Sequence, residues 1–240
     1  MLLRFYHNIL FFLASAAFCY ASYPADIMPG KEFQDTLQEK QFIYNGRIWR
    51  NMHTRVRGHS YFLTGEFVTV NLYFNGKEYK NLKIKYDIFD DEILLFINPL
   101  TTINLNKEMV ERVSFDYEGI KYDIVNMGND SSAIINGYTN ILYEGPSSFY
   151  VKYVKKIEPM ADENRYDRFF ETHRMYIRRD SLILPFSGKK RLFSIMEDKK
   201  AELKDFIRKN RLTISRKNPY TFIPLIEAYD KLSDKGRVFQ

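Results

Sequence analysis

A two-residue alternation of apolar and polar side chains dominates the chain from about residue 41 to residue 186. Successive side chains of a strand point to opposite faces of a sheet, so each alternating run predicts a strand with one apolar and one wet face, as in antiparallel sheets. The apolar members of four such runs are Val68, Val70, Leu72 and Phe74; Leu82, Ile84, Tyr86 and Ile88; Val113, Phe115 and Tyr117; and Ile120, Tyr122 and Ile124.

Turn signals that contain glycine separate these runs. Asn75-Gly76 predicts a hairpin most strongly, because a type I′ turn needs a positive φ at both central positions. The other signals are Asn45-Gly46, Arg57-Gly58, Glu118-Gly119, Asn136-Gly137 and Glu144-Gly145-Pro146. No helical pattern between the runs is long enough for a parallel crossover. The predicted fold is therefore mainly β within the α+β class: a strongly curved antiparallel meander sheet or partial barrel, with amphipathic helices at the C-terminus.

The periodicity becomes helical after Phe186. Three stretches carry an apolar stripe: Leu192, Ile195 and Met196; Leu203, Phe206 and Ile207; and Phe222, Leu225, Ile226, Tyr229 and Leu232. Asp198 is expected to cap the second helix and Asn210 to end it, whereas Thr221 is expected to cap the third. The narrow stripes favour helices that pack on the sheet, although a basic helix over residues 198–210 can also bind a membrane surface.

The first 21 residues have the pattern of an export signal. Arg4 precedes an apolar run over residues 9–18, and small residues follow around Ala21. The run is too short to span a membrane, so no transmembrane segment is expected after the signal is removed. Cleavage is predicted after Ala21. Lipid attachment at Cys19 is the less favoured alternative, because Phe18 is bulky where such a site takes a small residue.

The predicted organisation has four parts: a signal peptide over 1–21, a lead-in segment over 22–40, a β-rich body over 41–187 and a helical segment over 188–240. Cys19 is the only cysteine and leaves with the signal, so the body is expected to have no disulfide, cysteine metal ligand or cysteine nucleophile.

Charge is distributed unevenly along the chain. Residues 22–149 hold 13 Lys and Arg against 17 Asp and Glu, whereas residues 150–240 hold 22 against 13. Such an imbalance indicates either a basic face toward an anionic partner or lysines that are simply solvated. For an exported protein the expected partners are an envelope protein, a lipid or a glycan, and nucleic acid is not expected.

The densest acidic group is Asp87, Asp90, Asp91 and Glu92. Hard oxygen ligands close in sequence can bind calcium, the one cofactor considered, but a polar turn between two strands is the favoured alternative. The same carboxylates are also candidates for acid–base chemistry in a hydrolase.

Arg47, Trp49 and Arg50 form a second candidate site, for ligand binding. A tryptophan between two arginines can stack on a sugar or accept a cation–π contact, and the alternative is a core tryptophan with exposed neighbours. His53 and His59 can face each other and hold a metal if a hairpin joins their strands, and the favoured alternative is a pair of surface or strand-end histidines. No phosphate-binding loop or nucleophile motif is present, so no catalytic residue is predicted.

Several strings in the chain resemble uncharacterised exported proteins of Bacteroidetes-type bacteria. They are Tyr44-Asn45-Gly46-Arg47-Ile48-Trp49, Tyr86-Asp87-Ile88-Phe89-Asp90-Asp91-Glu92-Ile93, Leu105-Asn106-Lys107-Glu108-Met109-Val110, Gly137-Tyr138 through Leu142-Tyr143, and Asp198-Lys199-Lys200. The resemblance implies a location in the periplasm or at the outer-membrane periphery of a Gram-negative bacterium, and it implies no activity.

Three functions remain open from the sequence. The leading hypothesis is a non-catalytic exported envelope protein that acts as a binding or assembly module. The second is a periplasmic carrier that holds an apolar or lipid ligand in an aromatic-lined concavity. The third is a glycan-directed hydrolase that uses Asp87, Asp90 or Asp91, alone or with His53 or His59.

Overall fold

A computed structural model describes residues 42–128, 130, 133–159 and 166–237. The chain divides into two units, Met1–Phe42 and Ile43–Gln240, and the sheet and helices described here belong to the second. The predicted signal peptide, its cleavage after Ala21, lipid attachment at Cys19 and the lead-in segment over 22–40 lie outside the described residues and stay predictions.

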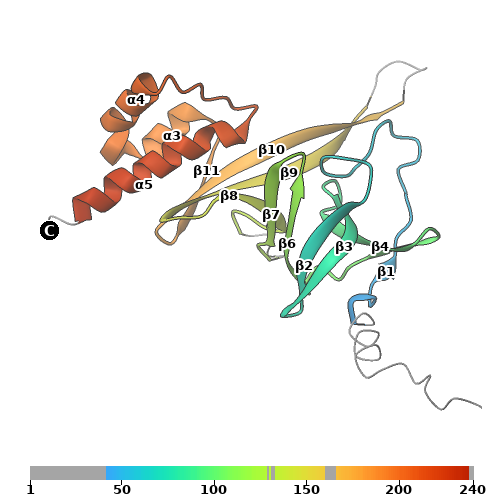
Figure 1. Ribbon diagram of the computed structural model, residues 1–240. Helices are drawn as coiled ribbons and strands as arrows, with labels where there is room; N and C mark the ends of the chain where they lie inside the picture. The colour runs from blue at the N-terminus through green and yellow to red at the C-terminus, as the bar shows by residue number, and fades with distance from the viewer. Residues whose placement is uncertain (1–41, 129, 131–132, 160–165, 238–240) are drawn as a thin grey trace, which may run out of the picture. The chain divides into compact units, whose positions relative to one another are not determined.

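The described strands form one eleven-stranded antiparallel sheet (Figure 1). They are β1 (Arg47–Ile48), β2 (Val68–Phe74), β3 (Lys77–Asp87), β4 (Glu92–Asn98), β5 (Thr101–Asn104), β6 (Val110–Tyr117), β7 (Ile120–Asn126), β8 (Tyr138–Tyr143), β9 (Ser147–Glu158), β10 (Arg168–Arg179) and β11 (Leu182–Phe186). Their order in the sheet is β1-β5-β4-β3-β2-β6-β7-β8-β9-β10-β11. Most neighbours in the sheet are neighbours in sequence, and β1 and β11 are the two ends. The predicted antiparallel meander is confirmed, and the sheet does not close.

The hairpin turns follow the chemistry expected of them. Asn75 and Gly76, between β2 and β3, have φ values of 51° and 76°, and Glu118 and Gly119, between β6 and β7, have φ values of 50° and 78°. Positive φ at both central positions matches the twist of the strands that each turn joins.

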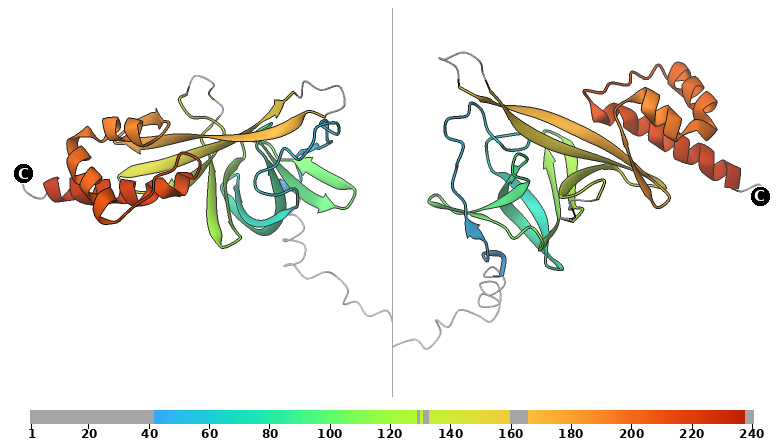
Figure 2. Two further views of the ribbon diagram at one scale, coloured as in Figure 1. Left: turned by 90° about the horizontal axis from the view of Figure 1, so that it is seen from above. Right: turned by 180° about the vertical axis from the view of Figure 1, so that it is seen from behind.

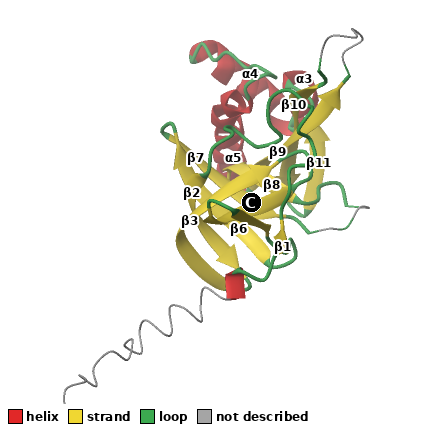
Figure 3. Cartoon of the chain, turned by 90° about the vertical axis from the view of Figure 1, so that its right-hand side faces the viewer, coloured by secondary structure: helices red, strands yellow, loops and turns green. Residues whose placement is uncertain are grey.

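Helical elements occupy the C-terminal part, as predicted (Figures 1 and 3). They are α3 (Lys189–Ile195), the 3₁₀ turn η2 (Glu197–Lys199), α4 (Lys200–Lys209), the 3₁₀ turn η3 (Pro219–Phe222) and α5 (Ile223–Arg237). The views in Figure 2 show the three helices together beside one end of the long β9–β10 hairpin.

The predicted end of α4 at Asn210 is confirmed, but the two predicted helix caps are wrong. Asp198 lies inside η2, where its carboxylate accepts a hydrogen bond from the Tyr229 hydroxyl at 3.2 Å. Thr221 lies inside η3, and Asn218 caps that turn by accepting from the Tyr220 N–H. A 3₁₀ turn precedes each helix and draws the expected cap residue into it.

Two large hydrophobic cores lie on the sheet, beside a small cluster of Ile135, Tyr150 and Tyr176. The first is built mainly from β2 to β8, and the second packs β9 to β11 against the helical elements. Tyr153 of β9 packs against both cores. The second core contains fully buried residues from the sheet and from the helices, among them Phe149, Leu203 and Leu225, so the helices pack on the sheet as their stripes predicted. Among the described residues, no helix has the length and apolarity needed to cross a membrane.

Candidate functional site: a basic groove at the open edge of β10

Among the described residues, part of one edge of β10 has no neighbouring strand. β10 pairs with β9 along its whole length, but β11 covers it only from Met175 to Arg179. At the other end, the Phe169 N–H donates to the Arg57 carbonyl at 3.1 Å, away from β9. Alternate residues of a strand direct their N–H and C=O groups to the same side, so Glu171 and His173 point theirs to this uncovered edge.

The short length of β11 explains why the edge is open. β11 ends at Phe186, and α3 begins at Lys189, so the chain leaves the sheet after five paired residues. Residues 168–174 of β10 therefore extend beyond the last pair of the β10–β11 hairpin. An unpaired strand edge is a template for another extended chain.

A groove of about 950 Å³ follows this edge. Its floor contains apolar side chains, of which Met175 and Phe186 are each only 4% exposed. Its opposite side comes from the beginning of α3 and from the connection between α4 and η3. The His173 ring nitrogen Nε2 lies 2.9 Å from the Arg216 carbonyl oxygen. Because a carbonyl oxygen can only accept, Nε2 carries the proton and ties this connection to β10.

Positive charge dominates the groove lining. Arg174 of β10, Arg191 of α3, and Arg216 and Lys217 of the connection all line it. None of these four side chains forms an ion pair within the described part of the chain. Of the described residues that line the groove, Glu171 alone is acidic, and its carboxylate already faces the Lys155 ammonium at 3.8 Å. The groove therefore offers unpaired cations to an anionic ligand.

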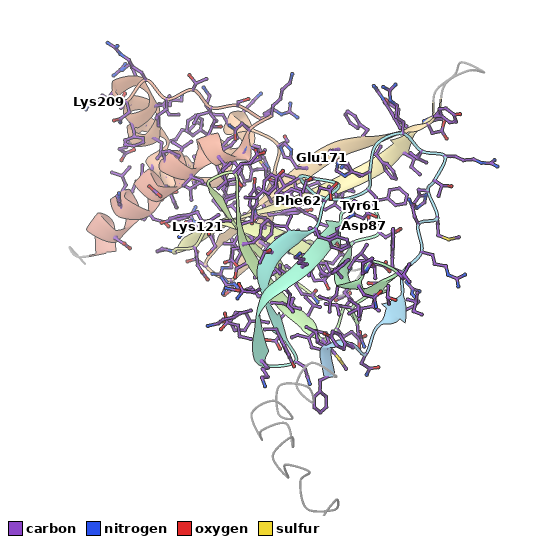
Figure 4. All side chains as sticks on the ribbon, turned by 45° about the vertical axis from the view of Figure 1, so that its right-hand side comes forward. Tyr61, Phe62, Asp87, Lys121, Glu171 and Lys209 are labelled. Atoms are coloured by element: carbon purple, nitrogen blue, oxygen red, sulfur yellow. The ribbon has the colours of Figure 1, made fainter. Side chains whose placement is uncertain are left out.

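A buried polar cluster adjoins the groove at Glu171. The Lys155 ammonium donates to the His59 and Tyr61 carbonyl oxygens at 2.9 and 2.6 Å. Burial lowers the pKa of Lys155 and raises the pKa of Glu171. Burial and the nearby Lys155 charge lower the pKa of His59. Figure 4 shows Tyr61, Asp87 and Glu171 close together in this region.

The donors and acceptors of this cluster hold the segment before β2 in place. The Ser60 hydroxyl donates to Asp87 at 2.5 Å, and the other Asp87 oxygen accepts from the backbone N–H groups of Phe89 and Asp90. Asp87 is 2% exposed. Its carboxylate is thus occupied by a hydroxyl and a turn, which is the arrangement of a structural anchor.

The four predicted acidic residues have separate partners. Asp91 accepts from the Lys107 and Lys152 ammonium groups at 2.6 and 3.0 Å. Asp90 and Asp91 lie in the turn between β3 and β4, Asp87 ends β3 and Glu92 begins β4, so the predicted turn is present.

Glu92 and Asp90 each lie beside a basic side chain. Glu92 forms an ion pair with Arg47 at 3.0 Å, and exposed Asp90 lies 4.0 Å from the His53 ring. In the described residues, no group of three His, Cys, Asp or Glu side chains is arranged to hold a metal ion. Calcium binding stays a hypothesis.

The Arg47–Trp49–Arg50 site lies at β1, on another part of the sheet from the groove. Trp49 is half-buried, and its ring centroid lies 6.2 Å from that of Tyr61. Arg47 and Arg50 are exposed.

His53 and His59, the predicted facing pair, pack on different aromatic rings. His53 packs on Phe89, with ring centroids 4.8 Å apart, and His59 stacks on Tyr61 at 5.8 Å.

Sequence reasoning missed the groove residues Arg174, Arg191, Arg216 and Lys217. The only signal for them was the basic excess of residues 150–240. That excess gives a sign of charge but no location, because the four side chains come from three separate elements.

Fold and site together define a mainly antiparallel β protein with a helical C-terminal segment and a basic groove at an open strand edge. No family model, curated protein or solved structure matches the chain. The resemblance to exported Bacteroidetes-type proteins stays a prediction.

Proposed function

We propose that the protein is a non-catalytic binding module that captures an extended acidic segment of a partner protein. The segment adds as a strand to the open edge of β10, where it pairs with the backbone groups of Glu171 and His173. The observation that carries the proposal is the coincidence of this open edge with four unpaired cations. In strand addition, main-chain hydrogen bonds supply affinity and the surrounding side chains supply specificity.

A peptide suits the groove better than a lipid does. An open strand edge presents both donors and acceptors, and only another backbone offers both at the matching spacing. An apolar chain would cover the floor but would leave the edge groups without partners, which is costly once they are buried.

The two other functions receive less support. For a carrier, aromatic rings would have to line a cavity. In the first core, however, the Phe62 ring packs on Tyr86, Tyr122 and Tyr153 at centroid distances of 6.0, 5.4 and 4.6 Å, as the rings of a filled core do. For a hydrolase, the buried Asp87 carboxylate is occupied by Ser60 and the turn.

We place this module in the envelope of a Gram-negative bacterium, on the strength of the N-terminal signal pattern. The partner would then be another exported protein with an acidic extended segment.

Binding of fluorescent model peptides tests the proposal. The probe is a decapeptide of alternating Glu and Val, and its controls are a Lys–Val peptide and an alternately N-methylated Glu–Val peptide. Fluorescence anisotropy should show binding of the unmodified acidic peptide only, because N-methylation removes backbone donors and the lysine peptide repels the four cations.

Two substitutions at one position separate backbone pairing from side-chain effects. Glu171→Pro removes an N–H that faces the open edge and should weaken acidic-peptide binding about tenfold relative to Glu171→Ala, which keeps the N–H. Proline is tolerated on a strand edge, so both variants should fold. Equal binding by the two variants, or equal binding of the N-methylated peptide, would show that strand addition is wrong.

A further inference from the structure

A second basic cleft lies between α3 and α4. It has a volume of about 530 Å³ and is lined by Lys189, Lys190, Phe193, Ser194, Lys200, Lys204 and Ile207. Phe193 and Ile207 provide an apolar floor, and four lysines surround it. None of the described residues that line the cleft is acidic. The cleft differs from the β10 groove in two ways: helices rather than a strand edge form it, and all of its described cations are lysines.

Most of the cations at this cleft have no acidic partner in the part of the chain that the structure describes. Residues 189–209 contain eight Lys and Arg and four Asp and Glu. Three of the four acids are already paired, Glu197 with Lys200, Asp205 with Arg208 and Asp198 with Arg179.

Among the described residues, Lys189, Lys190 and Lys204 form no ion pair, and all three are exposed. The inner side of α4 is occupied by packing, since Leu203 is fully buried in the second core. The helix therefore packs on the sheet and still presents lysines to its surroundings.

We infer that this cleft docks the protein on an anionic membrane surface, with lipid phosphate groups between the lysines. An ammonium group is a compact point charge that suits phosphate, and its apolar stem can lie along lipid while the charge stays in the headgroup layer. Each lysine near an anionic surface strengthens binding about fivefold. The apolar floor favours a lipid over a soluble phosphate, because the glycerol and upper acyl carbons of a lipid would cover Phe193 and Ile207. This inference does not depend on the proposed peptide groove.

Co-sedimentation with vesicles tests the inference. The protein should bind vesicles of phosphatidylcholine that contain about one third phosphatidylglycerol, and it should not bind vesicles of phosphatidylcholine alone. Raising the salt from about 0.1 M to about 0.5 M should release it, since screening shortens the reach of the charges.

A pair of charge-matched double variants locates the contact. Lys190→Glu with Lys204→Glu should reduce binding to the anionic vesicles more than tenfold. Lys121→Glu with Lys209→Glu makes the same change in net charge outside the cleft, because Lys121 lies on β7 and Lys209 at the end of α4 (Figure 4). This second double variant should bind within about threefold of the unaltered protein. All four side chains are exposed, so both proteins should fold, and circular dichroism checks this.

Three outcomes would overturn the inference. The first is an equal loss of binding in the two double variants, which would indicate a general charge effect. The second is equal binding to phosphatidylcholine alone. The third is full competition by millimolar inorganic phosphate, which would identify a soluble phosphate as the ligand.

Discussion

Lys155 and Glu171 stand directly opposite each other on β9 and β10, with the ammonium nitrogen 3.8 Å from a carboxylate oxygen. Lys155 is buried and Glu171 is half-exposed at the groove. The pair thus joins two regions of the molecule: the segment that Lys155 anchors through two carbonyl oxygens, and the open strand edge to which Glu171 belongs.

Removal of the Lys155 ammonium should destabilise the protein. Lys155→Met leaves the His59 and Tyr61 carbonyl oxygens without their donor and should lower the free energy of unfolding by about 2 kcal/mol. Urea unfolding followed by the fluorescence of Trp49, the only tryptophan, measures this. Lys156→Met is the matched control, because exposed Lys156 on the same strand has no ion pair in the described residues; it should change stability by less than about 0.5 kcal/mol. Similar values for the two variants would contradict the anchoring role.

His59 should make stability depend on pH. Its pKa in the folded protein lies below the ordinary value of 6.5, because burial and Lys155 disfavour the imidazolium. The unfolded chain therefore binds a proton at a higher pH than the folded protein does. Stability should fall as pH drops below 6.5 toward the lowered folded-state pKa.

Urea unfolding at pH 7.5 and 5.5 checks the effect of His59. The loss of stability between these pH values should be smaller in His59→Gln than in the unaltered protein. The raised pKa of Glu171 acts in the opposite direction but is present in both proteins, so it cancels in the comparison. An identical loss in both would exclude His59 as the cause.

Asp91 should matter more than its neighbour Asp90. Asp91→Asn weakens the interactions with Lys107 and Lys152 and should lower the free energy of unfolding by about 2 kcal/mol, since both ion pairs are largely shielded from solvent. Asp90→Asn changes an exposed carboxylate three residues after the buried Asp87, and it should cost less than about 0.5 kcal/mol because the backbone N–H of Asp90 that bonds Asp87 is kept. Equal melting behaviour of the two variants would show that the lysine pairs contribute nothing.

Calcium should not stabilise the protein. The Asp87, Asp91 and Glu92 carboxylates already accept protein donors, so a cation would have to displace them. Thermal melts with millimolar calcium or with EDTA should give melting temperatures within about 1 °C of each other. A rise of several degrees with calcium would instead support the calcium site that the acidic sequence suggested.

Two glycines with positive φ should differ in their response to alanine. Gly119 has a φ of 78° and open space where a Cβ would lie, so Gly119→Ala should cost about 1 kcal/mol from backbone strain alone. Gly137 has a φ of 63°, and its Cβ would collide with the Asp91 carboxylate. Gly137→Ala should therefore cost at least about 2 kcal/mol. Equal costs in urea unfolding would mean that Asp91 moves away freely.

The local elements were predictable because their causes act over a few residues. Val68 to Phe74 alternates at period two and is β2, and Asn75-Gly76 has the two positive φ values that its hairpin needs. The caps predicted at Asp198 and Thr221 are wrong because a cap depends on where the helix begins. The preceding 3₁₀ turns, which the apolar stripes do not reveal, moved that point.

By itself, the sequence determined the antiparallel meander, its main turns and the basic helical end, through periodicity and the charges of neighbouring residues. Only the tertiary structure decided which partners the acids take and where the sheet is left open. Asp91 meets Lys152 from 61 positions along the chain, and Arg57 pairs with the far end of the β10 edge. The groove exists because β11 is shorter than β10 and because Arg191 and Arg216 return to that edge from separate elements. Such contacts depend on chain length and packing rather than on any local pattern.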